Sequence, residues 1–323
     1  MKRRIKAVFG AALLAASLSA CGLDINAAVP YQIEPASIQP VPSLQGVKVT
    51  VGSKDFTENI ILGYMAEMAL TAAGVDVVDL TDIKGSNSAR QALLNGQIDM
   101  SWEYTGTGWI NYQGNELPVP GGEKAQFDAT KAADESKNGI TWLDYSPLND
   151  QYAFAVTDAY GQKNNLKTTT DMTNFLKQNP DQAVFCLETE FTSRQDGFPG
   201  ALKKYGFPVT TIKNFGIGTI YSSIKSGTCN IGEVFTTDGR IKGLNLRILE
   251  DDKQTFPQYN ASVTLRTEFL KQHPELRNVL EPVGKAMTNQ QMIDLCKEVD
   301  IDGKSAAEVA KNWMVGKGFV KAS

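Results

Sequence analysis

A repeated segment limits the folds that this chain can adopt. Residues 85–108 (GSNSARQALLNGQIDMSWEYTGTG) align without a gap with residues 216–239 (GIGTIYSSIKSGTCNIGEVFTTDG). In each copy a predicted helix ends at glycine, and a short predicted strand ends at Tyr104 or Phe235, followed by threonine. The repeat predicts two similar α/β lobes, each with an aromatic ring at the carboxyl end of a strand, where open α/β sheets bind ligands. Chance similarity is the alternative, because α/β units reuse glycine at helix ends.

A second repeat predicts where the chain passes between the lobes. The segments YAFAVTD (152–158) and YNASVTLR (259–266) each carry a tyrosine followed, four residues later, by Val-Thr. We interpret them as the two segments that cross from one lobe to the other, so that both contribute to a hinge. The sequence therefore predicts an α/β fold of two lobes joined by a two-segment hinge, with lobe 1 at 47–150 and 257–323 and lobe 2 at 151–256.

The N-terminal residues indicate export. Basic residues precede an apolar run, Val8 to Leu18, that is too short for a stable membrane anchor, so residues 1–20 are predicted to be a signal peptide. The sequence Leu-Ser-Ala-Cys ending at Cys21 resembles a bacterial lipobox, which implies cleavage before Cys21 and lipidation of that residue. An ordinary signal peptide with an incidental cysteine is the alternative. Proline-rich residues 21–46 are predicted to form an extended tether.

Charge and histidine content disfavour several functions. A formal net charge of −4 gives no support to nucleic-acid binding, which normally requires a basic surplus. The one histidine, His273, precedes Pro274 in a polar run and is predicted to lie in an exposed turn. Without further histidines the chain lacks the commonest general base and the usual nucleophile partner. We therefore expect no enzyme activity, no metal and no cofactor.

Three cysteines follow Cys21. In the oxidising setting that the export signal indicates, Cys186 and Cys229 could form a disulfide while Cys296 stays buried and free. Three unpaired thiols are the alternative.

The first α/β unit predicts an anion-binding turn. Residues 47–51 form a β-branched strand, Gly52 turns the chain, and an amphipathic helix follows until Gly74. Asp55 and Glu58 have the spacing of a capping box at the start of this helix. The free amide groups of that helix terminus would lie at the carboxyl end of the strand.

Four segments resemble the substrate-binding proteins of ABC importers for quaternary ammonium compounds, the glycine betaine, choline and carnitine family. They are VGSKDFTENIILG (51–63), NGQIDMSWEYTGTG (95–108), VFTTDGRI (234–241) and FPQYNASV (256–263). The resemblance implies the bilobal type II fold of periplasmic binding proteins, which closes around a trimethylammonium group inside an aromatic box. Such a group donates no hydrogen bonds and is attracted to ring faces by about 0.5–2 kcal/mol per ring. The box residues carried over are Tyr104, Tyr152, Phe235 and Tyr259.

The resemblance also implies residues for the other end of the ligand. Lys54, Thr107 and Arg194 match positions that hold a carboxylate in betaine-binding relatives, and the backbone carbonyl of Asp150 matches one that faces the cation. Phe235 departs from the family pattern, in which many members have tyrosine. A phenylalanine face still attracts a cation but offers no hydroxyl group for hydrogen bonding.

The predicted function is that of a lipid-anchored, monomeric receptor on the extracytoplasmic face, which delivers a quaternary ammonium solute to a membrane permease. A receptor of the same fold for an aromatic compound or a betaine-like thione is the alternative. A hydrolase that uses Asp99 and Glu103 is a more remote alternative. These residues would lie about 13 Å apart along a strand. Paired carboxyl groups need roughly 5–10 Å. Strand alternation turns Glu103 away from Tyr104, which predicts a structural role for its carboxylate.

Overall fold

The structure is a computed structural model that describes residues 30–116 and 121–323. The predicted signal peptide and Cys21 lie outside the described residues. Within those residues no helix is both long and apolar enough to cross a membrane.

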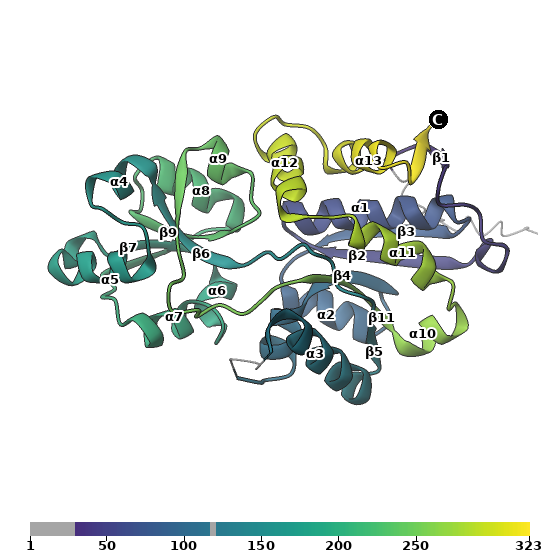
Figure 1. Cartoon of the computed structure of the whole chain (residues 1–323), viewed down its shortest axis with the longest axis horizontal. Coiled ribbons are helices and arrows are strands. Elements are labelled where there is room, and N and C mark those ends of the chain that lie inside the picture. The colour runs from purple at the N-terminus through teal and green to yellow at the C-terminus, as the bar shows by residue number, and fades with distance from the viewer. Residues whose placement is uncertain (1–29, 117–120) are drawn as a thin grey trace, which may run out of the picture.

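Two five-stranded sheets form the two lobes, at the right and left of Figure 1. Both sheets have the same strand order, since β3-β2-β4-β11-β5 in lobe 1 corresponds to β8-β7-β9-β6-β10 in lobe 2. The strands of lobe 1 are β2 (Lys48–Lys54), β3 (Asp76–Ile83), β4 (Met100–Tyr104), β5 (Ile140–Trp142) and β11 (Ala261–Arg266). Those of lobe 2 are β6 (Tyr152–Thr157), β7 (Val184–Leu187), β8 (Thr211–Asn214), β9 (Ile231–Phe235) and β10 (Leu246–Leu249). The two similar lobes predicted from the repeat are confirmed.

Helices cover both faces of the lobe 1 sheet, with α1 and α13 on one side and α2 and α3 on the other (Figure 1). The helices of this lobe are α1 (Thr57–Ala72), α2 (Ser86–Leu94), a π-helix (Thr107–Tyr112), α3 (Gly122–Asn138), α10 (Thr267–Gln272), α11 (Leu276–Lys285), α12 (Asn289–Asp300) and α13 (Ala306–Gly316). Those of lobe 2 are α4 (Asp158–Lys163), α5 (Thr169–Gln178), α6 (Thr189–Ser193), α7 (Phe198–Tyr205), α8 (Ile217–Lys225) and α9 (Arg240–Gly243), with a 3-10 turn at Pro180–Gln182.

The chain crosses between the lobes twice, from β5 to β6 and from β10 to β11. Each crossing leads into a strand that runs antiparallel to both of its neighbours in the sheet that it enters. Strands β6 and β11 occupy the same position in the two sheets, as the second repeat predicts. The crossing segments therefore bring strand ends of both sheets to one cleft.

The tether prediction is wrong for the part of 21–46 that begins at Tyr31. Strand β1 (Ile33–Pro35) pairs antiparallel with β12 (Val320–Ala322), and a 3-10 turn follows at Pro42–Leu44. Tyr31 and Leu44 are buried against lobe 1, and the Tyr31 hydroxyl donates to Glu67 on α1 at 3.3 Å. These spaced apolar side chains cover helix α1, a contact that the proline content of the segment does not reveal.

The capping-box prediction is also wrong. Helix α1 begins at Thr57 after Phe56, without a side-chain cap. The Asp55 carboxylate accepts a hydrogen bond from the backbone N–H of Gly85 at 3.0 Å, and the Glu58 carboxylate accepts from hydroxyl groups of other elements. Helix α1 is buried over most of its surface, because it lies between the sheet and helices α11 to α13. Because both carboxylates bond groups of other elements, neither caps the start of α1.

A disulfide joins Cys186 in β7 to Cys229 just before β9, the pair that the sequence analysis named. Their Cα atoms are 5.8 Å apart, and the bond closes 43 residues of lobe 2. Cys296 in α12 is buried and free. The bridge therefore ties together two neighbouring strands of the lobe 2 sheet.

Removing this bridge is expected to lower the free energy of unfolding. Replacing both cysteines, C186A/C229A, should cost about 2–4 kcal/mol, because the unfolded chain regains the freedom that the closed loop removes. Chemical denaturation with and without a thiol reductant measures the effect. The reductant should shift the midpoint of the wild type and of a C296A control but not that of the double variant. A shift of equal size in the double variant would contradict the pairing.

Candidate ligand-binding site

A pocket lies between the two lobes, and all eight residues predicted for ligand contact line it. These are Lys54, Tyr104, Thr107, Asp150, Tyr152, Arg194, Phe235 and Tyr259. The other lining residues were not predicted: Asp55, Phe56, Gly85, Ser86, Glu188, Glu190 and Ile217.

Sheet register places the aromatic residues. Tyr104 at the end of β4 is opposite Ala261 at the start of β11, and Tyr259 lies two residues before Ala261. In lobe 2 the same arrangement puts Tyr152, at the start of β6, directly opposite Phe235 at the end of β9. Each lobe thus presents a ring at a strand end, beside a ring of the adjacent crossing segment.

Five rings form a continuous wall. The ring centre of Tyr152 lies 5.3 Å from that of Phe235 and 5.5 Å from that of Tyr259. Phe56, which the sequence analysis missed, lies 5.1 Å from Phe235 and 5.9 Å from Tyr104 and so joins the two lobes. Its position at the carboxyl end of β2, where α/β sheets bind ligands, is the signal that would have found it.

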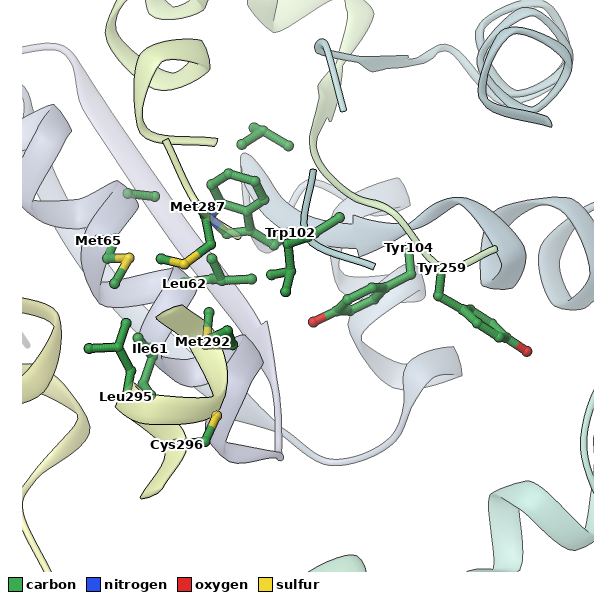
Figure 2. Close-up of a cluster of buried hydrophobic side chains, with 14 of the residues drawn as sticks. Ile61, Leu62, Met65, Trp102, Tyr104, Tyr259, Met287, Met292, Leu295 and Cys296 are labelled. Atoms are coloured by element: carbon green, nitrogen blue, oxygen red, sulfur yellow. The ribbon is translucent and has the colours of Figure 1, made fainter. Parts of the chain in front are cut away.

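Two tyrosine hydroxyl groups are held by buried carboxylates. Tyr104 donates to Glu58 at 2.7 Å, and Tyr259 donates to Asp196 at 2.7 Å. Burial raises the pKa of both hydroxyl groups well above the usual range, so they remain donors. Figure 2 shows Tyr104 and Tyr259 side by side, beyond Trp102, which lies among apolar side chains of the core. Packing against the core and hydrogen bonds from the hydroxyl groups therefore orient the rings of Tyr104 and Tyr259.

The predicted cationic residues already have anionic partners. The Lys54 ammonium group lies 2.5 Å from a Glu103 oxygen, and both side chains are buried. Arg194 donates to both oxygens of Asp196, to Glu190 at 2.9 Å, and to the Thr107 hydroxyl of the other lobe at 3.2 Å. We refer to Lys54, Thr107 and Arg194 as the polar end of the pocket. This end adjoins the rings, because Lys54 Nζ lies 5.0 Å from the ring centre of Tyr104 and Arg194 Cζ lies 5.6 Å from that of Tyr152.

Two glutamates of lobe 2 face this polar end. Burial, together with the nearby carboxylates of Glu190 and Asp55, raises the pKa of Glu188 to about 7. Burial also acts on Glu190, but the Arg194 guanidinium group and the Ser86 backbone N–H, which donates at 3.0 Å, hold its pKa below the usual value. The bond from Ser86 to Glu190 is a further direct contact between the lobes.

The carboxylates considered for catalysis have structural partners. Asp99 accepts from the Thr50 backbone N–H at 2.8 Å and from Arg266 at 2.6 Å, and it does not line the pocket. Besides Lys54, Glu103 accepts from the Tyr112 hydroxyl at 2.6 Å. In the part of the chain that the structure describes, no group of His, Cys, Asp and Glu side chains has the arrangement of a metal site.

Comparisons with known proteins agree with this architecture. Residues 47–315 match the family described as the substrate-binding domain of ABC-type glycine betaine transport systems. The chain is 32% identical to a glycine-betaine-binding protein of Pseudomonas aeruginosa, over 84% of this chain and 88% of that one. It is 31% identical to an ergothioneine transport permease/ergothioneine-binding protein of Helicobacter pylori, over 87% of this chain and 49% of that one.

A solved structure supports the same assignment. The crystal structure of a glycine betaine/carnitine/choline ABC transporter protein is 26% identical to the chain and superposes with a TM-score of 0.69, covering 84% of this chain and 99% of the other. The bilobal binding-protein fold is therefore confirmed. With most of its length matched, the chain belongs to the family of substrate-binding domains of ABC-type glycine betaine transport systems.

Proposed function

We propose that this protein is the solute receptor of an ABC importer and captures a quaternary ammonium compound by closure of its lobes. The observation that carries the proposal is the wall of five rings, which come from both lobes and meet in one pocket. A ligand that touches rings of both lobes stabilises the closed arrangement, so binding shifts the receptor toward closure. No chemical step belongs to this function.

The ring end suits a methylated cation. Each ring face attracts such a cation by about 0.5–2 kcal/mol when water is excluded, and the effect accumulates over several rings. Phe56 and Phe235 offer no hydroxyl group to the ligand, whereas Tyr104 and Tyr259 already donate theirs to carboxylates. The walls therefore present carbon surfaces to methyl groups.

The polar end suits a carboxylate. Arg194 has five N–H groups, of which four donate to protein oxygens, which leaves one for a ligand. The Thr107 hydroxyl accepts from Arg194 at 3.2 Å, and Lys54 also lines the pocket. We propose that a ligand carboxylate joins this existing network, as in glycine betaine or carnitine, while choline would leave it untouched.

The export signal and lipobox supply the location in this proposal. Lipidation of Cys21 would anchor a monomeric receptor on the extracytoplasmic face of the membrane, beside the permease that takes up the solute. The packed segment from Tyr31 onward shortens the tether, so the anchored body would lie close to the membrane surface.

Isothermal titration calorimetry with glycine betaine, choline, carnitine, ergothioneine and an aromatic compound tests the proposed function. Binding of at least one of the first three supports it. If only ergothioneine binds, the ligand is a quaternary ammonium compound but none of these three osmolytes. If only the aromatic compound binds, the receptor function holds and the ligand class is wrong. If none binds, the receptor proposal for these solutes fails.

The contribution of one ring can be separated from that of its hydroxyl group. Tyr152→Leu should weaken binding of choline and glycine betaine by about 2- to 30-fold, because one cation–ring attraction is lost. Tyr152→Phe keeps the ring face and should bind within about twofold of the wild type. Calorimetry measures both variants. Equal losses in the two variants would argue against a box that acts through ring faces.

The carboxylate end can be tested by a ratio of affinities. Arg194→Met removes the guanidinium group and should lower the affinity for glycine betaine relative to choline by about tenfold or more, because a charged hydrogen bond is lost only for the ligand with a carboxylate. The ratio cancels any effect of the variant on lobe closure, which both ligands share. An unchanged ratio would show that Arg194 does not contact the ligand carboxylate.

A further inference from the structure

Glu58 lies where the two lobes meet behind the aromatic box. Its side chain belongs to α1 of lobe 1, and the residue is 3% exposed. One carboxylate oxygen accepts from the Tyr104 hydroxyl at 2.7 Å, and the other accepts from the Thr237 hydroxyl at 2.6 Å. Thr237 follows β9 in lobe 2. A single carboxylate therefore connects a box ring of lobe 1 with the Thr237 side chain of lobe 2.

A second buried carboxyl group lies beside this contact. Asp150, on the crossing segment before β6, lines the pocket and accepts from the Thr237 backbone N–H at 3.3 Å. It is 5% exposed. Among the described residues, neither Glu58 nor Asp150 takes part in a salt bridge, whereas Lys54, Arg194 and Arg240 are each paired with another acid. Two carboxyl groups beside the rings thus have no salt-bridge partner in the described residues.

Because neither buried carboxyl group has a paired cation, burial favours the protonated form of both. Burial raises the pKa of Glu58 to about 7, and burial together with the Glu58 charge raises the pKa of Asp150 well above its usual value. The charge of Asp238 acts on the pKa of Glu58 in the same direction. Asp238 is paired with Arg240 at 2.5 Å, and burial raises the pKa of the Cys296 thiol well above its usual value, which keeps it neutral.

We propose that Glu58, together with Asp150, is a proton-linked latch between the lobes. Glu58 joins Tyr104 to Thr237 across the cleft. The pair of carboxyl groups holds a proton in the empty receptor and releases it when a cationic ligand is enclosed. The cation of the ligand supplies the missing countercharge. No bond other than that of the departing proton changes, and the proton passes to water or buffer. This inference rests on the proposed function in one respect, namely that the ligand is a cation.

The sign of the pH dependence follows from linkage. A cation near a carboxyl group favours its ionised form, so the pKa of Glu58 is lower in the complex than in the empty receptor. Between the two pKa values the complex holds fewer protons, so affinity rises with pH and reaches a plateau above the pKa of the empty receptor. Each unit of lowering corresponds to about a tenfold gain in affinity.

Calorimetry with choline tests this latch, because choline carries a cation and no group that titrates near neutral pH. At pH 7, the observed enthalpy in buffers of different ionisation enthalpy gives the number of protons released. The wild type should release a measurable fraction of one proton, and this release should disappear by about pH 8.5. Glu58→Gln, which keeps the shape of the side chain, should lose most of the release. No release by the wild type, or equal release by the variant, overturns the proposal.

The contact across the cleft has a test that needs no ligand. Thr237→Val removes the hydroxyl group but keeps the shape of the side chain, and Thr237→Ser keeps the hydroxyl group. Small-angle X-ray scattering of the ligand-free protein at pH 7 should show a larger radius of gyration for the valine variant than for the wild type and the serine variant. Equal radii in all three proteins overturn the latch. Because this measurement uses no ligand, its result does not depend on whether the proposed function holds.

Discussion

The antiparallel pairing of the two crossing strands determines the geometry of the site. Strand β11 pairs with β4, and strand β6 pairs with β9, so each aromatic strand end lies beside a segment that passes between the lobes. A shift of either pairing by one residue would turn Tyr104 or Phe235 to the opposite face of its sheet. The same backbone bonds thus form the hinge and assemble the box, and the lobes cannot move far without altering the distances between rings.

Buried charge gives the pocket two different ends. At the polar end, Lys54 and Arg194 are paired with Glu103 and Asp196, because a lone buried cation would lose several kcal/mol of hydration. At the ring end, Glu58 has hydroxyl donors but no cation. The protein therefore places two carboxyl groups without a paired cation beside the rings and balanced ion pairs elsewhere in the same pocket. This arrangement suits a ligand that carries a cation together with a carboxylate or hydroxyl group.

Sequence reasoning succeeded where a pattern repeats and failed where a contact is made between distant elements. The two repeats predicted the strands that carry Tyr104 and Phe235, because sheet order is the same in both lobes. Glu58 has the local spacing of a helix cap, and only the fold shows that its partner Thr237 lies 179 positions away. The packing of Tyr31 on α1 escaped prediction for the same reason. Pairs of this kind have no local periodicity to detect.

Phe235 shows how the absence of one hydroxyl group affects such a box. Its ring is held by Phe56 and Tyr152 at 5.1 and 5.3 Å, and its backbone N–H donates to the Tyr221 hydroxyl at 3.0 Å. Phe235 is half-buried, and a tyrosine hydroxyl group that is shielded from water needs a partner, as that of Tyr104 has Glu58. Phenylalanine avoids that requirement, so lobe 2 contributes an apolar wall that can move against the ligand without breaking a hydrogen bond. The hydrogen bonds that resist opening are then left to Glu58, Glu190 and Arg194, at the edges of the pocket.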